Sequence, residues 1–267
     1  MNDQPLDPLT EEQQKKGNIL AVSTAEQFKT VEELFERAQS NSVYYTLLIL
    51  SILIVATGLL LGNAPIVIGG MLVTPVLTPI LVIALGLVVG EIRAIKHPGI
   101  LVLKSVIITI FISALMTVAF GEHAMNQALE NTLRTAVLYF IVASASGVAA
   151  TLAWVRKDIA DIMPGISIAV SLVPPLSLIG IELGALDLEA ARFYFLIFCL
   201  NFVGIILGSM IVFSLLKFQK SGWEVQRQVE QTEKLQAAQQ AKKQAAKVKK
   251  KMDEVKQTIE ASREINS

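Results

Sequence analysis

The sequence predicts an all-α integral membrane protein, and three observations support that class. Hydrophobic residues make up 53% of the chain and charged residues 17%, with a mean hydropathy of +0.56, whereas about a quarter of the residues in soluble domains are charged. Charged residues are absent from five windows, 44–90, 105–121, 135–155, 162–181 and 193–216. These windows are apolar on all sides, as expected of helices surrounded by lipid.

Six transmembrane helices account for the five windows. A span needs about 20 mostly apolar residues, and the first window is long enough for two spans separated by the break Gly62-Asn63-Ala64. The predicted spans are 43–62, 65–90, 99–120, 133–154, 164–185 and 190–217. The expected domains are an N-terminal segment (1–42), the six-helix domain (43–217) and a C-terminal tail (218–267).

The placement of Lys and Arg predicts the orientation. Basic residues gather before the first span and after the second, fourth and sixth, while acidic residues dominate the alternate connections. The positive-inside rule then places both termini in the cytoplasm, which predicts a multi-pass protein of the inner (cytoplasmic) membrane. The forty polar residues before the first span lack the pattern of a cleaved signal peptide.

Two flanking helices are expected outside the spans. Ser23 and Glu26 form a capping pattern before the apolar residues Phe28, Val31, Leu34 and Phe35. An amphipathic helix over 23–38 is therefore expected to lie on the inner membrane surface or to dock on the bundle. Residues 241–259 carry a weak heptad seam, which favours a homo-oligomer joined by a coiled tail, with a solvated helix as the alternative.

Spans two and five contain helix-breaking residues. The second has Gly69-Gly70, Thr74-Pro75 and Thr78-Pro79; the fifth has Pro174-Pro175 flanked by Ser171 and Ser177. Proline lacks an N–H group and clashes with the preceding turn, so each Thr-Pro pair is expected to be the N-cap and first residue of a new half-helix. Within a membrane such breaks are tolerated only where protein or water satisfies the backbone, so both should face inward.

The two breaks also resemble each other. At an offset of one hundred residues, 65–75 and 165–175 share identical residues at five positions, including Val73/Val173 and Pro75/Pro175. Each break lies in the middle span of a set of three, so the second set enters the membrane from the opposite side. The sequence therefore predicts two inverted three-helix repeats with Gly/Pro-broken helices 2 and 5.

These stretches also resemble a known family. The run NAPIVIGGMLVTPVLTPILVIALGLVVGE (63–91) and the run MPGISIAVSLVPPLSLIGIEL (163–183) are similar to signature segments of a family of bacterial and archaeal membrane proteins, catalogued as domain of unknown function three hundred and eighty-nine. The segments 143–154 and 195–213 resemble its fourth and sixth spans. The family has no assigned activity, so the resemblance implies neither a substrate nor catalytic residues.

The paired breaks favour a channel or secondary transporter for a small solute, with an anion slightly preferred because helix N-termini attract negative charge. Carbonyl groups of the preceding half-helices offer the alternative of a cation such as sodium. The predicted path is lined by Gly69, Gly70, Thr74, Pro75, Thr78, Pro79, Ser171, Pro174, Pro175, Ser177 and Asn201. Glu182 is expected to reach the membrane interface from the end of its span.

Other readings stay open. The Gly and Pro residues also suit kinks made for close packing, and the cluster from Ser144 to Ala150 favours a tight helix contact over a lining. A non-transporting membrane scaffold or sensor that assembles through its C-terminal helix is the alternative function. The expected partners are the lipid bilayer, a small solute or ion and further copies of the chain. We expect no enzyme activity, catalytic residue, cofactor, metal or nucleic acid, because no nucleotide, nucleophile or zinc motif is present.

Overall fold

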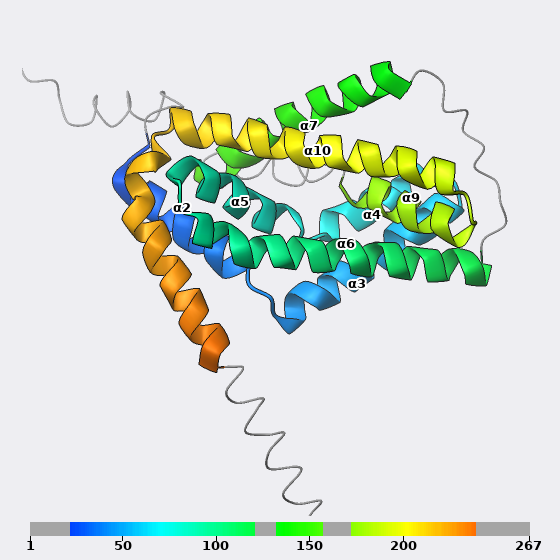
Figure 1. The fold of residues 1–267 in the computed structure, drawn as a ribbon, viewed down its shortest axis with the longest axis horizontal. Coiled ribbons are helices and arrows are strands. Elements are labelled where there is room, and N and C mark those ends of the chain that lie inside the picture. Colours follow the sequence, from blue (N-terminus) through cyan, green and yellow to red (C-terminus); the bar gives the residue numbers. More distant parts are fainter. Residues whose placement is uncertain (1–21, 121–131, 157–171, 239–267) are drawn as a thin grey trace, which may run out of the picture. The chain divides into compact units, whose positions relative to one another are not determined.

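The structure is a computed structural model that describes residues 22–120, 132–156 and 172–238. Within these ranges the chain is helical and contains no strand (Figure 1). The elements are α2 (Thr24–Arg37), α3 (Ser42–Leu60), α4 (Ala64–Val73), α5 (Leu77–Val89), α6 (Ile92–Phe120), α7 (Thr132–Val155), α9 (Val173–Gly184), α10 (Leu188–Leu215) and the 3₁₀ turn η2 (Phe218–Ser221). The prediction of an all-helical fold is confirmed for this part of the chain.

Four of the described helices, α3, α6, α7 and α10, are long and apolar enough to cross a membrane. The pair α4 and α5 passes the same test as one span bent by 57°, which makes up to five spans. The chain is thus a multi-pass membrane protein by the length and composition of its helices. The predicted fifth span corresponds only to the short α9, because residues 164–171 lie outside the described residues.

The boundaries agree with the predicted spans to within a few residues except in α6. This helix begins at Ile92, well before the expected start at 99, and carries Pro98 inside it. Proline in a helix interior removes a hydrogen bond and usually breaks the helix. Helix α6 nevertheless continues through Pro98, which lies in its second turn and is buried.

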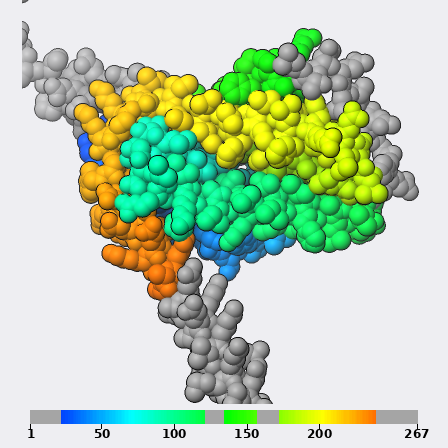
Figure 2. Space-filling model, in the orientation of Figure 1, coloured from blue at the N-terminus to red at the C-terminus, as the bar shows by residue number. Residues whose placement is uncertain are grey.

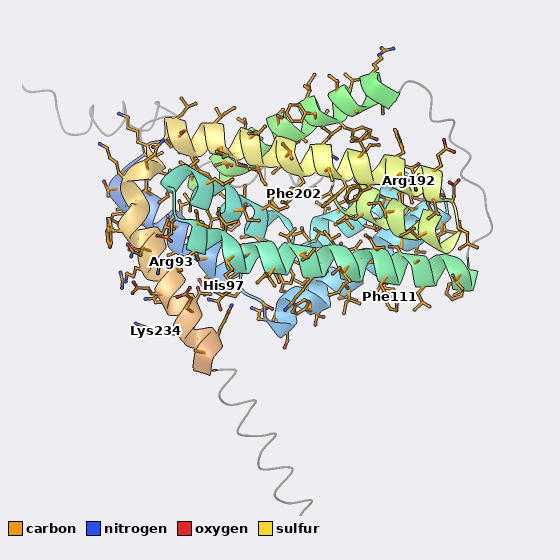
Figure 3. All side chains as sticks on the ribbon, viewed as in Figure 1. Arg93, His97, Phe111, Arg192, Phe202 and Lys234 are labelled. Carbon is orange, nitrogen blue, oxygen red and sulfur yellow. The ribbon has the colours of Figure 1, made fainter. Side chains whose placement is uncertain are left out.

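Helix α6 shows how the bundle meets its surroundings. One face carries the buried hydroxyl residues Ser105, Thr109, Ser113 and Thr117, and the opposite face carries exposed apolar side chains. Phe111, for example, is 68% exposed and projects from the outer side of the helix (Figure 3). A soluble helix has the reverse arrangement, so this distribution is that of a helix with a lipid-facing apolar side.

The membrane helices form a packed bundle within the compact unit Met1–Val225. Helices α5 and α9 each pack on both α6 and α10, α3 packs on α4, α6 and α9, and α7 packs on α10. In Figure 1 the two short helices α5 and α9 accordingly lie between the long helices α6 and α10. In the space-filling view, side chains of α6 and α10 lie uncovered on the face toward the viewer (Figure 2).

Glycines at the contacts show the direction in which neighbouring helices run. A β-carbon at Gly180 of α9 would collide with the Ile110 carbonyl oxygen of α6, and one at Gly184 would lie 2.7 Å from the Ala114 carbonyl oxygen. The contact advances by four residues on both helices, so α6 and α9 run parallel.

Helices α7 and α10 also run parallel. A β-carbon at Gly204 would lie 3.0 Å from the Phe140 carbonyl oxygen, and one at Gly208 would collide with the Ser144 carbonyl oxygen. A β-carbon at Gly147 would collide with the backbone of Ile205. The predicted tight helix contact at 144–150 is therefore confirmed; backbones approach this closely only where glycine leaves out the side chain.

The N-terminal helix α2 docks on the bundle. Its predicted capping box is present, with the Ser23 hydroxyl accepting from the Glu26 N–H and the Glu26 carboxylate accepting from the Ser23 N–H. Val31 and Leu34 are fully buried, and α2 packs on α5, α7 and η2. Phe28 meets the ring of Trp223 edge to face at 4.7 Å between ring centroids. Of the two predicted locations, docking on the bundle is the one observed.

The second compact unit is Gln226–Ser267. Its described part, 226–238, is helical. The predicted heptad seam over 241–259 lies outside the described residues, so the coiled tail stays a prediction.

Candidate functional site at the helix breaks

The first break separates α4 from α5 and is made by three residues. Thr74 ends α4 with φ −67° and ψ 127°, an extended conformation imposed by the following Pro75. Val76 is the N-cap of α5, and no side chain caps this helix end. The prediction that Thr74 and Thr78 are N-caps is therefore wrong: Thr74 closes the preceding helix, and Thr78 falls in the first turn of α5.

The break frees backbone groups, and a serine from another helix satisfies one of them. The Thr74 N–H donates to the Met71 carbonyl oxygen at 3.3 Å and not to Gly70, its partner in a continuous helix. The Gly70 carbonyl oxygen accepts instead from the Ser51 hydroxyl of α3 at 2.8 Å. Ser51 also hydrogen-bonds the Thr74 hydroxyl. Because Ser51 has one proton, which it donates to Gly70, Thr74 is the donor in that second bond.

Close packing holds α4 against α3 beside this hydrogen bond. A β-carbon at Gly70 would lie 2.6 Å from the Val55 side chain and 3.1 Å from the Ser51 carbonyl oxygen. At the neighbouring Gly69 it would meet no atom within 4 Å. Only Gly70 is therefore required for the contact, while Gly69 faces outward.

The second break is described from Leu172 onward. Leu172 is the N-cap of α9 and Pro174 and Pro175 occupy the first turn, where proline is tolerated. The first N–H group with an intrahelical partner is that of Leu176, which donates to the Leu172 carbonyl oxygen at 3.4 Å. Because both prolines lack N–H groups, Leu172 and Val173 are the residues at this helix end whose N–H groups lie ahead of the first intrahelical bond.

The structure brings the two breaks together through apolar contacts. Val173, the first residue of α9, packs in a buried cluster with Val55 of α3 and Val67 of α4, and Leu59 and Met71 pack against it. Met71 also lies in the last turn of α4, just before Thr74. The start of α9 thus lies against α4.

The predicted path residues fall into several environments. Gly69 is exposed; Thr74, Pro75 and Thr78 are half-buried; Gly70, Pro79, Pro174, Pro175, Ser177 and Asn201 are buried; Ser171 lies outside the described residues. Hydrogen bonds link Thr74 and Gly70 through Ser51. Asn201 lies in α10, which packs on both α5 and α9.

Two polar features of the bundle were not predicted from the sequence. One is Ser51, which has no local motif around it. The other is the hydroxyl row of α6, where Ser105, Thr109, Ser113 and Thr117 recur every four residues and are buried. That spacing puts them on one helix face, so the row is detectable in the sequence. It faces α9 at Gly180 and Gly184, and the Ser105 hydroxyl hydrogen-bonds that of Tyr44 in α3 at 2.8 Å.

Glu182 lies in the last turn of α9, near the end of its span as predicted, and its side chain is only 8% exposed. Its reach to the membrane interface stays a prediction. Among the described residues, no group of three or more His, Cys, Asp or Glu side chains is arranged to hold a metal ion.

No solved structure matches the chain. An uncharacterized protein of Methanocaldococcus jannaschii is 23% identical over 212 residues, which cover 78% of this chain and 63% of the relative. The chain therefore spans less than two thirds of that relative's length. The model of the family described as Domain of unknown function (DUF389) matches residues 71–207, just over half of the chain and everything from the end of α4 through most of α10. The chain belongs to this family, whose function is unknown.

Proposed function

We propose that the protein is a channel or secondary transporter for a small solute whose path runs between the breaks of its second and fifth spans. The observation that carries the proposal is the contact between the start of α9 and α4, where Val173 lies in one buried cluster with Val67 of α4 and Val55 of α3. Interrupted helices that meet inside a membrane bundle supply unpaired backbone groups to whatever crosses between them.

The proposed architecture is six spans in two inverted repeats. The helix directions support it: α9 runs parallel to α6 and α7 runs parallel to α10, as in a chain that crosses six times with α9 as the second half of the fifth crossing. The packing is also similar in the two proposed repeats, in which α3, α5 and α6 correspond to α7, α9 and α10. Three helix pairs that pack together have counterparts, under this correspondence, that also pack together. The pair α3–α6 becomes α7–α10, α5–α6 becomes α9–α10, and α5–α10 becomes α9–α6.

The proposed orientation follows from the basic residues at the end of the bundle where α2 docks. Lys29 and Arg37 belong to α2, Arg93 and Lys96 to the start of α6, and Lys217 and Lys220 follow α10. By the positive-inside rule this end faces the cytoplasm, with the chain in the cytoplasmic membrane. A homo-oligomer remains part of the proposal through the tail.

The solute preference follows from the groups at each helix end. An anion fits the N-terminus of α5, where Val76, Leu77 and Thr78 each have an N–H group in the uncapped first turn. The N-terminus of α9 contributes less, because two of its first residues are proline. The anion preference thus rests mainly on α5.

Solute flux into liposomes tests the proposal. Purified full-length protein is reconstituted and assayed with a panel of small anions, cations and neutral solutes. We expect flux above that of empty liposomes for at least one solute. Thr78→Leu adds bulk at the break and should reduce that flux about tenfold or more. Val137→Leu, which adds bulk to an exposed side chain of α7, serves as the matched control and should leave flux unchanged.

Two outcomes contradict the proposal. Absence of flux for every solute, from protein that remains folded in the liposomes, favours the scaffold or sensor. Equal flux for Thr78→Leu and Val137→Leu rejects the assigned path even if the protein transports.

A further inference from the structure

We propose that the end of α4 forms a binding site for a small monovalent cation, with sodium as the best-fitting ion. The site consists of three oxygen atoms: the hydroxyl of Ser51, the hydroxyl of Thr74 and the carbonyl of Gly70. Its existence is independent of transport, whereas its use as a coupling-ion site rests on the proposed function.

The three oxygen atoms already converge. Ser51 Oγ lies 2.8 Å from the Gly70 carbonyl oxygen and in hydrogen-bond contact with Thr74 Oγ1. Each hydroxyl and each carbonyl oxygen has two lone pairs, so all three atoms have capacity to coordinate an ion once the hydroxyl protons turn away. Neutral oxygen ligands suit hard cations and not the soft metals that prefer sulfur or imidazole.

The electrostatic field of α4 also favours a cation at this point. Thr74 is the C-cap of α4, so the site lies at the negative end of the helix dipole. The last carbonyl groups of a helix lack intrahelical donors, and Pro75, which follows at once, has no N–H group to offer them. The helix end therefore presents backbone oxygens beside the two hydroxyl groups.

Among the described helices, the three that form the site and follow it carry no charged residue, which favours a single positive charge. Helices α3, α4 and α5 contain no Asp, Glu, Lys or Arg. Val55, Val67 and Val173 form an apolar wall next to the site. The desolvation free energy of a divalent ion is far larger than the stabilisation that neutral oxygen ligands provide without a carboxylate. A monovalent ion has a smaller desolvation penalty, which neutral oxygens at a helix end can offset.

Access comes from the side of the break. Ser51 is fully buried between the helices, while Thr74 is half-buried. An ion therefore reaches the site from the side of Thr74, and water at that side completes its coordination shell. This places the ion next to the first turn of α5, where the proposed anion would bind, so the two ligands would attract each other.

Thermal unfolding of the full-length protein in detergent tests the site without any flux measurement. Fluorescence of Trp154 and Trp223 reports unfolding while NaCl replaces choline chloride or KCl at constant ionic strength. A ligand that binds only the folded state raises the unfolding midpoint with its concentration. We expect a saturable rise with Na⁺ and a smaller one with K⁺.

Variants at Thr74 locate the effect. Thr74→Ser keeps the hydroxyl and should keep the Na⁺ response, whereas Thr74→Val should raise the half-saturating Na⁺ concentration at least tenfold. Ser51→Ala should do the same if it folds; the Thr74 pair decides the question if it does not. Thr151→Val is the control for loss of a threonine hydroxyl elsewhere in the bundle, because the buried Thr151 hydroxyl bonds the Gly147 carbonyl oxygen of its own helix.

The outcomes separate this inference from the proposed function. Equal effects of Na⁺, K⁺ and choline, or a Na⁺ response that survives in Thr74→Val, reject the site whether or not the protein transports. A hydroxyl-dependent Na⁺ response in a protein without flux establishes the site and leaves the transport proposal rejected. Flux that depends on Na⁺ and is lost in Thr74→Val supports both.

Discussion

The two broken helices begin from similar sequences but are built differently. In the first, Val73 is the last residue of α4 and Pro75 lies between two helices. In the second, the corresponding Val173 is the first residue of α9 and Pro175 lies in its first turn. A proline can follow a helix or occupy its first turn, so the same residues mark a helix end in one half and a helix start in the other.

This difference changes the chemistry that each break offers. The first leaves carbonyl oxygens at the end of α4, held by Ser51 and Thr74. The second has two prolines, which lack N–H groups, in the first turn of α9, where they are buried together with Ser177. Two stretches with similar sequences therefore need not present equivalent ligands, and three pairs of substitutions test how far the asymmetry extends.

The largest effect is expected at the glycine pair of α4. Gly70→Ala places a β-carbon 2.6 Å from Val55 Cγ2, and overpacking of this kind costs about 1–3 kcal/mol. Gly69→Ala meets no atom within 4 Å and should gain about 0.5–1 kcal/mol from lower backbone entropy in the unfolded chain. Unfolding midpoints in detergent measure both. Equal destabilisation by the two variants would show that α4 does not pack on α3 as described.

The serine pair compares the two breaks directly. Ser51→Ala leaves the buried Gly70 carbonyl without its side-chain donor and should cost about 1–3 kcal/mol. Ser177 is fully buried and its hydroxyl has no hydrogen-bond partner among the described residues, so Ser177→Ala should be neutral or stabilising by about 0.5 kcal/mol. The same unfolding assay separates the variants. A cost at Ser177 as large as that at Ser51 would remove the asymmetry.

The smallest effect is expected at the turns that follow the half-helices. Gly90 after α5 has φ 78°, and Leu186 after α9 has φ 64°. A side chain in this conformation costs about 1–2 kcal/mol, so Gly90→Ala should destabilise the protein and Leu186→Gly should stabilise it, each by about 1 kcal/mol or less. Both positions are exposed, so packing contributes little. Unfolding midpoints that shift in the same direction in both variants would contradict a left-handed backbone conformation at these two positions.

The fold was predictable where the signal is local. Uncharged windows gave the positions of α3, α6, α7 and α10, and the capping box of Ser23 and Glu26 gave the start of α2, because these features depend only on neighbouring residues. The break near Pro75 was predicted for the same reason. Its exact form was not: Pro75 and Pro79 both permit a helix start nearby, and the backbone begins α5 at Leu77, so neither Thr-Pro pair supplies the cap.

The candidate site was predictable only in part. Thr74 and Gly70 belong to the predicted path, but Ser51 comes from α3, which is apolar on all sides and gives no indication of which face meets α4. Contacts between such helices depend on rotation and register, which are set by close packing at Gly58 and Gly70. The hydroxyl row of α6 was missed although its four-residue spacing is visible in the sequence.

The docking of α2 has a consequence for how the protein is made. The Gln27 amide donates to the Leu216 carbonyl oxygen at 2.8 Å and accepts from the Ser221 hydroxyl at 3.0 Å. The ribosome synthesises Gln27 long before these two partners, which follow the last span. These two hydrogen bonds can therefore form only after α10 and the turn behind it have been synthesised, so the docking of α2 is completed late in assembly, even though its contacts with α5 involve an earlier segment.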